Sequence, residues 1–227
     1  MKLCGAPIGL DYGAEMMMAK WKFSTVGQES ESATDMNQPD RLEPLMGPLD
    51  ALQRLLTRFD DRGVIIGGTA VSILGKARFT EDLDAMFLLS LQDIPRLLET
   101  AKEEGIEPRI ENAVEFAEKN RVMLMRHIRS GTNIDISLGA IPFEQEMVER
   151  SIVHQVDETL QIRLPTPEDL IIMKAIAHRP KDLEDIRIIA EKYPNLDIQR
   201  IKQWVKEFGD VLEQPGLWKQ IEPCLKG

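Results

Sequence analysis

A glycine pair placed between a short apolar run and a later pair of aspartates is the feature that most limits how this chain can fold. Val64–Ile66 is apolar and predicts a buried strand, which runs directly into Gly67 and Gly68. A helix is expected over Thr69–Leu74, and a second strand over Asp82–Leu89. Because strands and helices alternate here, the pattern predicts an α/β (α+β) fold, with a small mixed sheet flanked by helices.

The two aspartates of this pattern predict a metal site. Asp82 and Asp84 are expected to point to the same side of their strand, because residues i and i+2 share a face. Adjacent carboxylates repel one another unless a cation lies between them, and oxygen ligands alone favour Mg²⁺ or Mn²⁺ over zinc. Asp135, in the β-rich run 133–138, is expected to complete the site from a neighbouring strand. Three such carboxylates can hold two cations roughly 3.5–4 Å apart for in-line nucleotidyl displacement.

The glycine pair predicts the phosphate-binding half of the same site. Gly67 and Gly68 allow the backbone to come close to a ligand, and a helix beginning at Thr69 presents free N–H groups to an anion. Two other phosphate motifs are absent from the sequence. There is no G-x-G-x-x-G, and Gly75-Lys76 has no glycine five residues before it. The arrangement therefore predicts a nucleoside triphosphate (NTP) as ligand.

The ordered set resembles the nucleotidyltransferase superfamily of the DNA polymerase β type. Its signature is Gly-Gly or Gly-Ser, a spacer and D-x-D, and here thirteen residues (69–81) separate Gly68 from Asp82. Arg78 and Thr80 before the acids are similar to the minimal bacterial and archaeal members. These include AbiEii-like toxins of abortive-infection and toxin–antitoxin systems and antibiotic nucleotidyltransferases. The runs 164–170, with Lys174, and 179–185 also resemble the AbiEii-like set, so the resemblance covers roughly residues 50–205.

The resemblance implies a role for each matching residue. Asp82 and Asp84 would ligate Mg²⁺, and Asp135 would complete the site and accept the proton of the attacking hydroxyl. Gly68 departs from the serine common in the family, so a hydroxyl contact to phosphate is lost or passes to Thr69. The expected nucleotide-binding set is Gly67, Gly68, Thr69, Arg78, Thr80 and Lys174.

Lys174 also stands out without the resemblance. It is the one charged residue within the apolar run Leu170–Ala177, where an ammonium needs an anionic partner or a route to solvent. A phosphate contact and a structural lysine whose head reaches water are both open interpretations. Asp182 and Asp185 lie in the first turns of the next predicted helix, and we interpret them as acids that suit the helix dipole.

Basic residues near the strand of Asp135 predict an acceptor-binding track or, equally well, a solvated strand face. The segment 119–130 carries four cations and no acid. The residues expected to bind an acidic acceptor such as RNA are Arg121, Arg126, Arg129, Arg179 and Lys181.

Three regions follow from the patterning. Residues 1–45 read as a disordered tail, 46–165 as the nucleotidyltransferase core, and 166–227 as a C-terminal helical region packed on the core. A helix over 49–59 is expected to end at Gly63. The other expected elements are a helix over 91–104, hairpins over 121–128/133–138 and 152–156/160–164, and helices over 167–178, 180–192 and 197–208.

Charge and composition exclude several classes of protein. The 28 Lys and Arg against 38 Asp and Glu give a net charge of −10, which disfavours general binding of nucleic acid and of duplex DNA. No apolar run approaches the roughly 20 residues that span a bilayer, so no membrane partner is expected. Two cysteines and three scattered histidines make neither a disulfide framework nor a zinc motif, and a cytoplasmic location is expected.

These features favour an Mg²⁺-dependent enzyme that transfers a nucleoside monophosphate from an NTP to an acceptor hydroxyl and releases pyrophosphate. The acceptor is tRNA if the protein is a toxin with a cognate antitoxin, and otherwise a small molecule, as in antibiotic-modifying enzymes, or a protein. A catalytically silent nucleotide-binding or interaction module of the same fold is the alternative from a different class. A purely structural domain would require the three acids to be coincidental.

Overall fold

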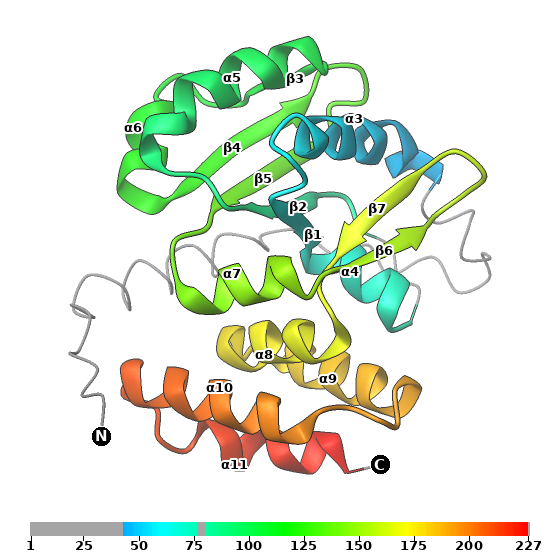
Figure 1. The fold of residues 1–227 in the computed structure, drawn as a ribbon, viewed down its shortest axis with the longest axis vertical. Helices are drawn as coiled ribbons and strands as arrows, with labels where there is room; N and C mark the ends of the chain where they lie inside the picture. Colours follow the sequence, from blue (N-terminus) through cyan, green and yellow to red (C-terminus); the bar gives the residue numbers. More distant parts are fainter. Residues whose placement is uncertain (1–42, 77–79, 227) are drawn as a thin grey trace, which may run out of the picture.

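A computed structural model describes residues 43–76 and 80–226 (Figure 1). The described chain begins with a 3-10 helix, η2 (Glu43–Leu45), three residues before the predicted start of the core, and Leu45 is buried. The rest of the predicted tail lies outside the described residues. The helices of the first part are α3 (Met46–Thr57), α4 (Gly67–Leu74), η3 (Leu91–Asp93), α5 (Ile94–Glu103), α6 (Ala113–Asn120) and α7 (Pro142–Glu149).

A mixed sheet forms the centre of the molecule. Its five strands, in the order β1-β2-β5-β4-β3, are β1 (Gly63–Ile66), β2 (Leu83–Phe87), β5 (Asn133–Leu138), β4 (Val122–His127) and β3 (Ile106–Pro108). β2 and β5 are parallel, and the other neighbours are antiparallel. This sheet and its flanking helices confirm the predicted fold class. The second predicted hairpin is also confirmed, as β6 (Ile152–Gln155) and β7 (Gln161–Leu164).

Strand register separates an apolar row from a polar row. Ile65, Ala85, Ile136 and Met123 are paired across β1, β2, β5 and β4, and all four are fully buried. Successive side chains in a strand alternate between faces, so the next row lies on the other face. That row contains Ile66, Asp84, Asp135 and Leu124. The central strands are therefore buried on both faces, and the carboxylates lie on the face that Ile66 and Met86 share.

The C-terminal helices gather at the end of the molecule opposite α3, α5 and α6 (Figure 1). They are α8 (Pro167–Ala177), α9 (Pro180–Lys192), α10 (Ile198–Val211), α11 (Leu217–Ile221) and the 3-10 helix η4 (Glu222–Leu225). Phe143 of α7 meets Trp204 and Phe208 of α10 with ring centroids 5.2 and 5.4 Å apart. Arg200 of α10 binds the buried Asp169 of α8 through Nε, at 2.8 Å. Aromatic packing and this ion pair thus join the helices to one another and to α7.

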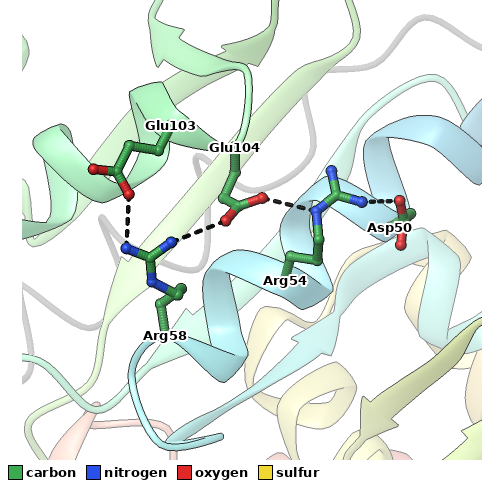
Figure 2. Close-up of polar contacts among 5 residues, drawn as sticks. All are labelled: Asp50, Arg54, Arg58, Glu103 and Glu104. Carbon is green, nitrogen blue, oxygen red and sulfur yellow. Dashed lines mark hydrogen bonds and ion pairs between the residues drawn. The ribbon is translucent and has the colours of Figure 1, made fainter.

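A cluster of charged side chains connects α3 to the end of α5 (Figure 2). Glu104 accepts from Arg54 Nε at 2.7 Å and from Arg58 Nη1 at 3.3 Å. Arg58 also binds Glu103 at 2.7 Å, and Arg54 binds Asp50 one turn earlier. Both arginine side chains are about half exposed, so each pair contributes at most about 1 kcal/mol.

Two predicted helix boundaries were wrong. α3 ends at Thr57 rather than at Gly63, because Asp60 and Asp61 adopt left-handed backbone conformations and turn the chain into β1. Gly63 is instead the first residue of that strand. α4 begins at Gly67, two residues earlier than predicted, so the glycine pair forms its first turn rather than a loop before it.

Two further findings concern membrane-spanning helices and cysteine pairing in the described part of the chain. None of the helices within 43–76 and 80–226 is long and apolar enough to cross a membrane. Cys224 is buried and makes no disulfide.

Candidate active site

The predicted carboxylates meet on two adjacent parallel strands. Asp84 of β2 pairs directly with Asp135 of β5, which confirms the expectation that Asp135 lies on a neighbouring strand. Asp82 precedes β2, and its Oδ1 accepts a hydrogen bond from Asn133 Nδ2 at 3.1 Å. Asp84 and Asp135 are 6% and 8% exposed, whereas Asp82 is only partly buried. Asp84 and Asp135 therefore lie side by side on one face, and Asp82, the most accessible of the three acids, lies just before β2 and is bound to Asn133 of β5.

Gly67 lies directly against Asp84. Its φ is +65°, a left-handed conformation that favours glycine. A Cβ atom added there would lie 2.7 Å from Asp84 Cγ and 2.8 Å from Asp84 Cβ. Glycine is thus required at position 67 for two reasons: the backbone is left-handed there, and a side chain would collide with the Asp84 carboxylate.

The start of α4 offers an unpaired hydroxyl. Thr69 is fully buried, and its Oγ1 has no hydrogen-bond partner in the described part of the chain. A buried polar atom without a partner is uncommon and marks a place for a ligand or water. Thr80 has a local role, since its Oγ1 donates to the carbonyl of Asp82 at 3.2 Å. Arg78, a member of the predicted nucleotide-binding set, lies outside the described residues.

An arginine that the sequence analysis missed binds Asp135 from the β3 edge of the sheet. Arg109 follows β3, and its Nη1 binds Asp135 Oδ1 and donates to the carbonyl of Met125 at 3.2 Å. Burial raises the pKa of Asp135 above the usual range of a carboxyl group, and the charge of Asp82 adds to this. Arg109 acts in the opposite direction, through both its hydrogen bond and its charge.

Lys174 has the anionic partners that its apolar helix requires. Its side chain is almost fully buried, with Nζ 3.0 Å from Asp182 Oδ1 and 2.9 Å from Asp185 Oδ2. Arg179 also binds Asp182, through Nε at 2.6 Å. The interpretation of Lys174 as a lysine whose head reaches water was therefore wrong. Asp182 and Asp185 do more than suit the helix dipole, because both are buried partners of Lys174. The predicted phosphate contact of Lys174 stays a prediction, and an arriving phosphate would compete with these two acids.

The predicted acceptor-binding residues occupy separate places. The guanidinium of Arg121 donates hydrogen bonds to the backbone carbonyls of Leu138 and Leu89, at 3.1 and 3.2 Å. Arg126 is exposed and bound to Glu107 of β3, and Arg129 is exposed in the turn between β4 and β5. Arg179 and Lys181 lie at the start of α9. These residues thus lie at the two ends of β4 and at the start of α9, and their role in acceptor binding stays a prediction.

The carboxylates fit a hard divalent cation in kind, because all their donor atoms are oxygen and Asp84 and Asp135 are paired on one face. Within residues 43–76 and 80–226, however, no three acidic, histidine or cysteine side chains converge closely enough to hold an ion in this conformation. One oxygen of Asp135 is bound by Arg109. The residues therefore suit a cation chemically, and Arg109 competes for one of them.

Comparison with known proteins defines the class of this chain. Residues 50–223 match a family described as "Nucleotidyl transferase AbiEii toxin, Type IV TA system". With the glycine pair and carboxylates described above, the match identifies an enzyme, a nucleotidyltransferase. More particularly, the chain belongs to the AbiEii family, and the match extends beyond the predicted 50–205 into the last helices.

A solved structure that is similar to this chain is available for comparison. It is the crystal structure of an antigenic nucleotidyltransferase-like protein from Paracoccidioides brasiliensis, 17% identical, with a TM-score of 0.45. The similarity covers 81% of this chain and 93% of that one. No curated protein matches this sequence.

Proposed function

We propose that this protein is a toxin of a toxin–antitoxin pair that transfers a nucleoside monophosphate from an NTP to an acceptor hydroxyl. The observation that carries the proposal is the direct pairing of Asp84 with Asp135, beside a glycine that leaves room only for the Asp84 carboxylate. Membership of a toxin family supports a cognate antitoxin as partner. tRNA is the favoured acceptor.

In the proposed reaction, the acceptor oxygen forms a bond to the α-phosphorus, and the bond from that phosphorus to the bridging oxygen breaks. Pyrophosphate leaves with that oxygen, and Asp135 accepts the proton of the attacking hydroxyl. A divalent cation held by Asp82, Asp84 and Asp135 would neutralise charge on the triphosphate and on the leaving pyrophosphate.

The chain's own groups bind and orient the nucleotide. Gly67 and Gly68 form the first turn of α4, whose free backbone N–H groups can donate to phosphate oxygens. Thr69 Oγ1, buried and without a partner among the described residues, is a further donor at the same helix end. We include Arg78, Thr80 and Lys174 in the proposed nucleotide site because of the family pattern.

Transfer of labelled nucleotide tests this function. The protein is incubated with each α-labelled NTP, Mg²⁺ and total RNA, and products are separated on a gel while pyrophosphate is measured. Asp82→Ala and Asp84→Ala should each abolish transfer, and Asp210→Ala, which removes an exposed acid on α10, should not change it. Transfer that survives both active-site changes would overturn the mechanism.

The acceptor is identified by which product gains label. Labelled tRNA supports the toxin proposal, whereas label only on an added antibiotic identifies a small-molecule-modifying enzyme. Bound NTP without any pyrophosphate release would contradict the catalytic proposal.

A further inference from the structure

Arg109 extends the row of paired residues that carries the carboxylates. Its backbone N–H donates to Leu124 O at 3.0 Å, immediately beyond β3. Leu124 is paired with Asp135, and Asp135 with Asp84. The guanidinium thus crosses one strand to reach Asp135, and Met125 O accepts from the same Nη1.

The surroundings of this ion pair distinguish it from the surface pairs. The side chains of Arg109 and Asp135 are 24% and 11% exposed, whereas those of Arg58 and Glu103 are 50% and 54% exposed. Water screens a partly buried pair less than an exposed one, so its electrostatic effect on neighbouring groups is larger.

The charge of Arg109 changes what the carboxylates can attract. Asp82, Asp84 and Asp135 carry three negative charges when ionised, and Arg109 cancels one of them at Asp135. A cation that bound Asp135 would lie close to the guanidinium and be repelled by it. It would also compete for an oxygen that already accepts a hydrogen bond.

We propose that Arg109 is a built-in competitor of the divalent cation for Asp135, and that it lowers the metal affinity of the free enzyme. Entry of the cation then requires Arg109 to release the Oδ1 atom of Asp135. Arg109 is a positioning residue in this proposal, acting through Asp135. The inference rests on the proposed function, because it takes the three carboxylates as the metal site.

The test measures Mn²⁺ binding to the full-length protein without nucleotide, by the loss of the free-ion electron paramagnetic resonance signal. Arg109→Gln should tighten Mn²⁺ binding by at least about tenfold, because it removes a positive charge that water screens only in part. Arg109→Lys, which keeps the charge, should bind less tightly than Arg109→Gln. Arg58→Gln, a charge removal on α3, should leave the affinity unchanged.

The direction of the change in Mn²⁺ affinity separates this role from simple structural damage. Arg109→Gln is expected to bind Mn²⁺ more tightly, whereas a damaged site would bind it more weakly. Thermal melts of each variant establish that it is folded. Equal or weaker Mn²⁺ binding by a folded Arg109→Gln overturns the proposal.

A further variant separates failure of this inference from failure of the proposed function. If wild type binds Mn²⁺, Asp84→Asn abolishes binding and Arg109→Gln leaves it unchanged, the metal site stands and only the role of Arg109 is refuted. If neither wild type nor Arg109→Gln binds Mn²⁺ saturably, both proposals are refuted.

Discussion

Replacing Gly67 with alanine tests whether the glycine pair serves the carboxylate beside it. The left-handed backbone at this position, φ +65°, costs a non-glycine residue roughly 1–2 kcal/mol. In addition, the new methyl group would lie 2.7 Å from Asp84 Cγ, so the Asp84 side chain must move. We expect nucleotidyl transfer to fall by about a hundredfold, since small misplacements of a reacting group have effects of this size.

Gly105→Ala is the matched control. Gly105 has a similar φ of +73°, but an added Cβ atom would have no heavy atom within 4 Å. Both variants should therefore unfold roughly 2–4 °C lower for each kcal/mol of backbone strain. Only Gly67→Ala should lose activity, measured as initial rate of labelled-nucleotide transfer at saturating NTP. Equal activities of the two variants would refute the argument that the glycine makes room for Asp84.

Three further predictions concern the buried and surface charges. Lys174→Met should destabilise the protein by roughly 3–5 kcal/mol in urea titrations, because it leaves Asp182 and Asp185 short of a buried partner, and an unchanged midpoint would contradict this. Burial alone would raise the pKa of Asp182, but hydrogen bonds and charge from Arg179 and Lys174 lower it overall. Asp182 therefore stabilises the fold above its unfolded pKa of about 3.9, and this contribution is lost as pH falls further. In thermal melts from pH 7 to pH 3, the melting temperature should fall less steeply for Asp182→Asn than for wild type. Parallel curves would contradict a stabilising role for the ionised Asp182 carboxylate. Glu104→Gln should lower the free energy of unfolding by about 1 kcal/mol or less. The difference between wild type and variant should shrink in about 1 M salt if the cluster is held by exposed charges.

Local chemistry explains why much of the site was predictable. Gly67, Asp82 and Asp84 lie within one short stretch, so their spacing and the period of a strand already place them together. Asp135 was predictable because the apolar residues on either side of it mark a strand, although its neighbour strand was an assumption.

Arg109 was not predictable in the same way. No motif surrounds it, and it reaches Asp135 only because β3, a short strand that the patterning did not predict, joins the sheet beside β4. The partners of Lys174 were missed for a different reason. Asp182 and Asp185 satisfy the usual preference for acids at the start of a helix. Because that preference alone accounts for them in the sequence, nothing there indicated that they are buried against α8.

Helix prediction failed where signals were weak or overlooked. α6 has few buried residues and no strong apolar stripe. α7 did carry a start signal, because Pro142 occupies its first position and the Glu144 carboxylate accepts from the N–H of Ile141 at 3.2 Å.

The pairing of Asp84 with Asp135 also has a consequence for folding. A shift of β5 by one residue against β2 would turn Asp135 into the buried layer of Ile136 and bring Ile136 to the polar face. An unpaired carboxylate in that layer would cost several kcal/mol, more than an ordinary register error between apolar strands. The acids that are proposed to bind the metal therefore also select the correct strand alignment, so a chain that has paired β2 and β5 wrongly is destabilised before it can present a defective site.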